Sequence, residues 1–287
     1  MTPAREVAAL SLNGVSAELE RLLERGHGIV LARSSAKQYA ARGRPVHPRE
    51  SLGGHPSLGI DIHRVYALMN RRSRRRRMRL FRQTFSFDPS TTVLDVGGLP
   101  AFWSDGRPEA DITLLNLHPP QVLPEAFHFI AGDATNLPFE DDSFDLVFSN
   151  SVIEHLGTPE KQAQMARELR RVGRALWVQT PSRDFPIEPH YLTPIVHWMP
   201  RTVRKKLLRN FSLWGWITRP SNEQVEAIVD EIRLLDHGEM VTLFPDCEIR
   251  RERFMGLTKS LIAVRRRPLR ASHSRPLSDA QFRPGRS

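Results

Sequence analysis

Five short apolar runs follow one another in the middle of the chain, and they constrain its fold more than any other feature. They occupy 92–96, 112–115, 127–130, 144–148 and 175–179. Each has the length of a buried strand, and strands separated by helical or loop crossovers form a parallel sheet. Two further runs, 248–255 and 260–264, predict a closing hairpin. We therefore expect an α/β fold with a mostly parallel seven-stranded sheet flanked by helices.

Helical signals surround these runs. Thr158 predicts an N-cap, Pro159 a first helical position and Gly173 an end for one helix. Ser221 and Gln224 predict a capping box for another, whose apolar stripe reaches Leu235. Helical spacing also occurs in 15–23 and 60–85. The predicted organisation is an N-terminal extension of unclear role over 1–60, one domain over 61–267 and a disordered basic tail over 268–287.

Charge and cysteine content limit the function classes. The net charge is +10, but 71–82 holds eight arginines and 265–287 seven, so the rest of the chain is slightly acidic. This distribution favours a solvated helix face and a loose tail over a nucleic-acid site, and peripheral membrane contact through 71–82 stays an alternative. Cys247 is the only cysteine, which excludes an internal disulfide and a thiolate-rich metal site. No run is apolar for long enough to cross a bilayer, so we expect a cytoplasmic protein.

Small and polar residues stand where the predicted strands end. Asp95, Gly97 and Gly98 close the first strand, and Asn116 closes the second about twenty residues later. In open α/β sheets, ligands bind beyond the carboxyl ends of the strands, where a small-residue turn lets the backbone approach the ligand. A side chain at the end of the second strand is suited to a ribose hydroxyl, and Asn116 can form that hydrogen bond.

The longest motif is Gly132-Asp133-Ala134 followed by Leu-Pro-Phe-Glu-Asp-Asp-Ser-Phe-Asp-Leu-Val-Phe-Ser-Asn, which ends at Asn150. Together with 92–98 it resembles class I S-adenosylmethionine methyltransferases, above all the group that includes the ubiquinone and menaquinone biosynthesis enzymes. The resemblance covers 92–181 and implies a Rossmann-like fold with S-adenosylmethionine as cofactor. It also implies that Asp133 accepts from the adenine amino group, that Ala134 offers backbone and that Asn150 lies near the methyl group.

Two departures from this pattern affect the expected site. Leu99 and Ala101 replace the second and third glycines of the family's first motif. Residues 151–153 lack the proline and aromatic residues of enzymes that methylate amide or exocyclic amino nitrogens. An oxygen or carbon acceptor on a small-molecule, lipid-like or glycan substrate is therefore favoured.

The acceptor region is expected in 181–220, a long stretch with many aromatic residues that suits an irregular lid over a pocket. His190 is the preferred general base and His155 the second candidate, although either histidine can also be structural. A metal held by Glu188, His190 and His197 is a weaker alternative, because no ligand spacing in the sequence supports it. The alternatives are a non-catalytic S-adenosylmethionine-binding protein and a nucleic-acid methyltransferase. The sequence does not indicate the oligomeric state.

Overall fold

The computed structural model describes residues 62–105 and 107–267. The predicted extension 1–60, its helix at 15–23 and the predicted tail 268–287 lie outside the described residues. No helix within the described ranges combines the length and the hydrophobicity that a membrane span requires.

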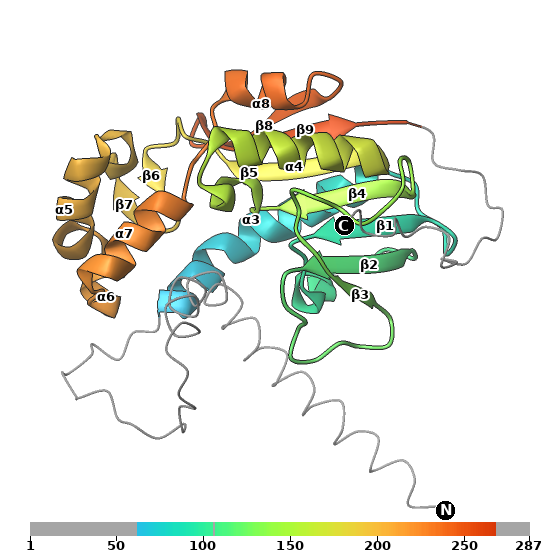
Figure 1. The fold of residues 1–287 in the computed structure, drawn as a ribbon, viewed down its shortest axis with the longest axis horizontal. Helices are drawn as coiled ribbons and strands as arrows, with labels where there is room; N and C mark the ends of the chain where they lie inside the picture. The colour runs from blue at the N-terminus through green and yellow to red at the C-terminus, as the bar shows by residue number, and fades with distance from the viewer. Residues whose placement is uncertain (1–61, 106, 268–287) are drawn as a thin grey trace, which may run out of the picture.

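A seven-stranded sheet forms the centre of the domain (Figure 1). Its strands are β1 (Thr92–Val96), β2 (Asp111–Asn116), β3 (His128–Ala131), β4 (Phe144–Asn150), β5 (Gly173–Pro181), β8 (Glu248–Phe254) and β9 (Leu257–Arg265). Their order is β3-β2-β1-β4-β5-β9-β8, in which the first five are parallel and β9 runs antiparallel to both of its neighbours. The predicted mostly parallel seven-stranded sheet and its closing hairpin are confirmed.

The helices lie on both faces of this sheet and in a separate lobe. They are α3 (Ile62–Thr84), α4 (Pro159–Val172), α5 (Arg201–Phe211), α6 (Leu213–Thr218), α7 (Asn222–Glu231) and α8 (His237–Leu243), with short 3-10 helices η1 (Pro100–Asp105), η2 (Ile153–Leu156) and η3 (Val196–Trp198). Among the described residues, the connections from β1 to β4 contain η1 and loops but no α-helix.

Alternating side chains divide the sheet into two apolar layers. Leu94 points into the layer that contains α4 and α8, whereas the adjacent Val93 points into the layer that contains α3. On α3, the helical spacing of Met78, Phe81 and Phe85 gives one apolar face, and Phe81 is fully buried. The sheet is thus covered on both faces, as parallel sheets require.

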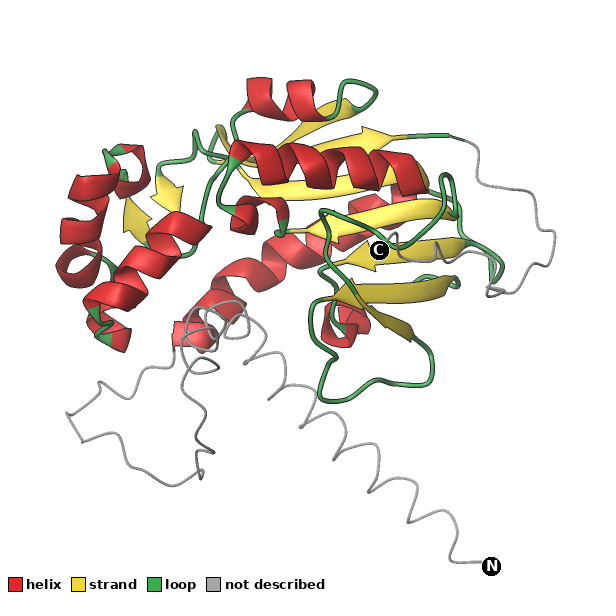
Figure 2. Cartoon of the chain, in the orientation of Figure 1, coloured by secondary structure: helices red, strands yellow, loops and turns green. Residues whose placement is uncertain are grey.

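The segment predicted as an irregular lid is largely regular, which corrects that expectation (Figure 2). It contains the two-stranded sheet β6 (Ile187–Glu188) and β7 (Thr193–Pro194), followed by η3, α5 and α6. Trp214 and Tyr191 are buried in a small core with α7, whereas Trp198 and Trp216 are exposed. The segment therefore forms a packed lobe beside the sheet.

The predicted helix ends are mostly confirmed. Thr158 caps α4 by accepting from the backbone N–H of Lys161, and the Ser221–Gln224 capping box opens α7. Gly173 ends α4 in an extended conformation as the first residue of β5, rather than in a left-handed cap. A Cβ at Gly173 would overlap Val147 on the neighbouring strand, which explains the glycine. The prediction that the apolar stripe of this helix extends to Leu235 was wrong, because α7 ends at Glu231.

Candidate functional site

The carboxyl ends of the parallel strands meet along one edge of the sheet. Val96 pairs with Leu115 and with Ser149, and Asn116 pairs with Ala131. The next residues along the chain, including Gly97 and Asp133, therefore begin at the same edge. The expected meeting of the strand-end motifs follows from this register.

Two glycines shape the turn after β1. Gly97 has a φ of +79°, and its N–H donates to the carbonyl of Leu115 at 2.7 Å. A Cβ at Gly97 would overlap the side chain of Val152, and a Cβ at Gly98 would overlap the carboxylate of Asp95. Both positions need glycine for close approach, whereas Leu99 and Ala101 are accommodated next to or within η1.

Asp95 lies beneath this turn and is buried. Its Oδ2 accepts a hydrogen bond of 2.8 Å from the indole N–H of Trp103. Burial raises the pKa of Asp95 to about 7, although the Trp103 hydrogen bond acts in the opposite direction. The carboxylate therefore supports the turn from below.

Asn116 and Asp133 flank the outer part of the same edge. Asn116 Oδ1 accepts from the N–H of Leu117 at 2.8 Å, so the side chain stabilises its own turn. Asp133 is exposed, and its Oδ1 accepts from both the N–H and the hydroxyl of Thr135. These two bonds fix the orientation of the carboxylate. Ala134 is half-buried and packs against the core.

Asn150, at the end of β4, is held by a residue that the sequence did not identify. Arg77 of α3 donates to Asn150 Oδ1 at 2.6 Å and to Gln179 Oε1 at 2.9 Å, and it pairs with Glu252 at 3.1 Å. Arg77 is buried, which corrects the expectation of a solvated arginine face at this position. Its place four residues before Phe81, on the apolar side of the helix, was the available signal.

Both candidate histidines lie in one cluster. His155 Nδ1 lies 3.0 Å from Glu231 Oε1, and His190 Nδ1 lies 2.6 Å from Glu188 Oε1. The two rings meet edge to face with centroids 4.9 Å apart. Burial lowers the pKa of His190, but the nearby carboxylates, Glu188 foremost, outweigh it and leave that pKa above its ordinary value.

The comparisons with known proteins agree with this arrangement. Residues 97–175 match the methyltransferase domain family. This match begins at the turn after β1 and ends in β5, so it spans the strand ends described above.

Individual relatives of the domain match over short segments. An uncharacterized methyltransferase of Mycobacterium avium is 33% identical over 95 residues, 30% of this chain and 38% of that protein. A putative methyltransferase of Encephalitozoon cuniculi is 49% identical over 43 residues, 15% of this chain and 20% of that protein. The chain therefore spans well under half the length of these curated relatives. A solved methyltransferase from Methanosarcina mazei shares 16% identity with a TM-score of 0.39, over 65% of this chain and 96% of that one.

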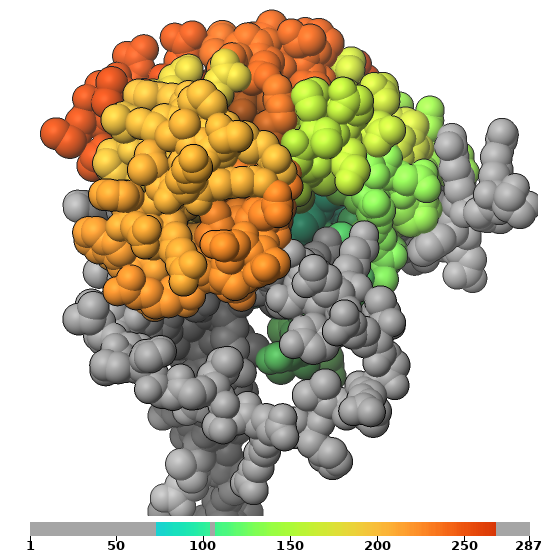
Figure 3. Space-filling model, turned by 60° about the vertical axis from the view of Figure 1, so that its left-hand side comes forward, coloured from blue at the N-terminus to red at the C-terminus, as the bar shows by residue number. Residues whose placement is uncertain are grey.

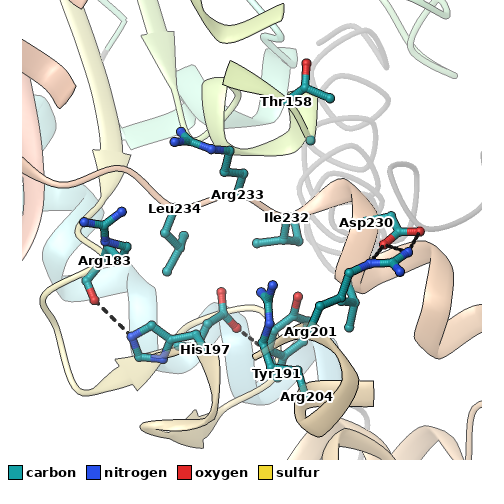
Figure 4. A pocket seen from close by; sticks show the side chains of 13 residues that line it. Thr158, Arg183, Tyr191, His197, Arg201, Arg204, Asp230, Ile232, Arg233 and Leu234 are labelled. Carbon is teal, nitrogen blue, oxygen red and sulfur yellow. Dashed lines mark hydrogen bonds and ion pairs between the residues drawn. The ribbon is translucent and has the colours of Figure 1, made fainter. Parts of the chain in front are cut away.

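A cavity of about 500 Å³ lies between the lobe of α5 to α7 and the segment that joins η2 to α4 (Figure 4). Its lining residues are Gly157, Thr158, Arg183, Glu188, Tyr191, His197, Arg201, Arg204, Val229, Asp230, Ile232, Arg233 and Leu234. Glu188 belongs both to this lining and to the histidine cluster, so the two features adjoin. Figure 3 shows the surface hollowed between the orange atoms of the lobe and the yellow-green atoms beside them, with teal atoms visible deep inside.

Four arginines line this cavity, but they differ in their partners. Arg183 pairs with Asp236, Arg201 with Asp230 and Arg233 with Glu239. Arg204 forms no salt bridge within the described part of the chain, and its Nε is buried without a hydrogen-bond partner. The guanidinium of Arg204 is therefore available to an anionic group.

Proposed function

We propose that the chain transfers the methyl group of S-adenosylmethionine to an oxygen or carbon atom of a small acceptor. The observation that carries this proposal is the register of β1 to β4, which brings the turn at Gly97 and the carboxylate of Asp133 to one edge of the sheet. The turn after β1 supports it, because Gly97 and Gly98 pack tightly on Val152 and Asp95, and their missing side chains leave the backbone of the turn bare at this edge.

The residues at this edge suit the parts of the cofactor in order. We propose that the backbone of Gly97 and Gly98 approaches the methionine end and that Asp133 accepts from the adenine amino group, next to the backbone of Ala134. Asn116 is placed to bond a ribose hydroxyl, and Asn150 to contact the region of the methyl group. Asp95 acts indirectly, by supporting the turn from its buried position.

When bound, S-adenosylmethionine supplies an electrophilic methyl group. The protein then has to align the acceptor with it and exclude water, so most of the rate comes from orientation. We place the acceptor in the cavity beside Glu188, where His190 and His155 would act on a hydroxyl group. Arg204 supports an acceptor with a carboxylate or phosphate, because a charged oxygen would satisfy its buried Nε.

Titration calorimetry with S-adenosylmethionine and S-adenosylhomocysteine tests the first step. Asp133→Ala should weaken both affinities about 10- to 100-fold, because a hydrogen bond to a charged group contributes about 1.5–3 kcal/mol. Asp184→Ala, which removes an exposed carboxylate beyond the end of β5, is the matched control. Absence of binding by the unmodified protein at millimolar cofactor would refute the proposal.

A non-catalytic protein that binds S-adenosylmethionine is the second candidate. The observation in its favour is that Asn116, in the ribose position, already bonds its own backbone. Incubation with labelled S-adenosylmethionine and fractionated metabolites separates the two. Cofactor binding without label transfer to any fraction would favour the binding protein.

A further inference from the structure

The cluster around His155 contains a carboxylate with an unfilled hydrogen-bonding position. Glu154 is fully buried; its Oε2 accepts from the hydroxyl of Thr180 at 3.0 Å, but its Oε1 has no hydrogen-bond partner. A buried, unpaired carboxylate oxygen is costly. Its surroundings therefore indicate what could satisfy it.

Two histidines lie close to the carboxylate of Glu154. Glu154, His155 and His190 can each offer one ligand atom, and these atoms all lie within 4.8 Å of one another. Ligand atoms on a tetrahedral zinc ion are about 3.4 Å apart, given bonds of about 2.0–2.1 Å. Small side-chain rotations would bring the three groups to that spacing.

The charge balance of the cluster also favours a cation. Three carboxylates, those of Glu154, Glu188 and Glu231, surround two imidazoles. Even with both imidazoles protonated, the group would carry a net negative charge. Metal ligation requires neutral imidazoles, which leaves three carboxylates with a charge of −3, and a divalent ion would reduce this charge to −1 without the entry of a further side chain.

The hydrogen bonds of the histidines match those of metal ligands in proteins. A ligating histidine commonly donates its second ring N–H to a carboxylate, which fixes the ring and its tautomer. Here the Nδ1 atoms of His155 and His190 lie at hydrogen-bond distance from Glu231 and Glu188. That geometry assigns ligation to the Nε2 atoms and an outer, orienting role to the two glutamates.

We propose that Glu154, His155 and His190 bind one divalent first-row transition metal ion. Mixed imidazole and carboxylate ligands suit zinc, iron or manganese, whereas magnesium and calcium prefer oxygen ligands alone. Glu154 and His155 belong to η2, which precedes β5 in the sequence, whereas His190 follows β5. The ligands are therefore too far apart in the sequence to form a recognisable metal-binding motif. The set of Glu188, His190 and His197 considered from sequence differs from this one at two positions.

The role of the ion, though not its binding, rests on the proposed function. Glu188 connects the cluster to the cavity, so an acceptor oxygen there could occupy an open position on the ion. A bound cation lowers the pKa of a coordinated hydroxyl group, whose proton would pass to water. The histidines would then act on the acceptor through the ion.

Zinc titration of the chelator-treated full chain tests the site. We expect one zinc ion per chain, with affinity reduced at least tenfold by Glu154→Gln and by His155→Ala. The controls are Glu125→Gln and His118→Ala, which change exposed residues between β2 and β3. Both should bind zinc with the affinity of the unmodified protein. No zinc binding by the unmodified protein, or equal binding by Glu154→Gln, would overturn the proposal.

Two additions keep the test decisive. If circular dichroism shows that Glu154→Gln does not fold, Glu188→Gln replaces it in the test. This variant keeps all three proposed ligands but changes the partner of His190, and it should weaken zinc binding about 10- to 100-fold. Unchanged affinity in that variant counts against the site. The cofactor is titrated in a parallel experiment. If the protein binds S-adenosylmethionine but no zinc, only the metal site is overturned. If it binds zinc but no S-adenosylmethionine, only the proposed function is overturned.

Discussion

The indole of Trp103 donates a hydrogen bond to the carboxylate of Asp95, and both side chains are buried under the turn at Gly97. The pair joins β1 to η1, which takes the place of a longer helix after the first strand. A titratable group thus sits directly below the backbone proposed to receive the cofactor, and the protonation of Asp95 becomes part of the stability of the site.

Asp95→Asn should stabilise the protein relative to the unmodified chain, increasingly so as the pH rises from 4 to 7. Burial raises the pKa of Asp95 to about 7, above roughly 3.9 in an unfolded chain, so folding takes up a proton in this range. The stability of the unmodified protein therefore falls as the pH rises through the range and stays low above it. The resulting change in the free energy of unfolding approaches roughly 4 kcal/mol, because each unit of pKa difference between the folded and unfolded states contributes about 1.4 kcal/mol.

Urea denaturation at several pH values measures this difference. Asn keeps an oxygen that can accept from Trp103, so the packing is retained. The exposed Asp184→Asn is the control, because it removes a carboxylate away from the turn. A stability difference between Asp95→Asn and the unmodified chain that stays constant from pH 5 to 8 would contradict the prediction.

Gly97→Ala should abolish cofactor binding and destabilise the domain by more than 2 kcal/mol, an estimate of about 1 kcal/mol for the left-handed backbone plus the overlap with Val152. Gly256→Ala is a matched control, since Gly256 also has a positive φ but a Cβ there meets nothing within 4 Å. The Gly256→Ala variant should lower the free energy of unfolding by only about 1 kcal/mol. Equal losses in both variants, measured by thermal denaturation, would show that Val152 does not matter.

The fold was predictable where local signals agreed with long-range packing. The buried runs, the predicted helix caps and the final hairpin each match one element, because short apolar runs and cap chemistry act over a few residues. The lobe over 181–220 was not predicted. In α5, the apolar positions Val203, Leu207 and Leu208 are separated by arginines and lysines, and the adjacent α6 contains Gly215, which hides the helical period.

The site was predictable only in part, for a related reason. Gly97 and Asp133 stand at strand ends, and parallel topology brings such ends together. Arg77 and Glu154 depend on contacts between distant segments. Arg77 reaches Asn150 of β4 from α3, and Glu154 lies close to His190, which follows β5 in the chain. No local pattern encodes such a meeting.

Arg77→Gln should destabilise the protein by about 3 kcal/mol, because breaking a buried charge pair leaves the partner carboxylate of Glu252 without its cation. It should also weaken cofactor binding, since Asn150 loses the donor that fixes its amide. Arg76→Gln, on the exposed side of the same helix, should change stability by less than about 0.5 kcal/mol. Indistinguishable denaturation midpoints for the two variants would refute the structural role of Arg77.

Arg204→Gln should remove an anion site from the cavity. Arg183 and Arg201 are neutralised by acidic partners, whereas Arg204 has a buried Nε with no hydrogen-bond acceptor. Inorganic phosphate should therefore raise the melting temperature of the unmodified protein, with an affinity about 10- to 100-fold lower in the variant, the equivalent of one charge-assisted bond of about 1.5–3 kcal/mol. Arg209→Gln, on the exposed face of α5, is the matched control. A phosphate response that survives in Arg204→Gln but is lost in Arg209→Gln would place the anion outside the cavity and remove the argument for an anionic acceptor.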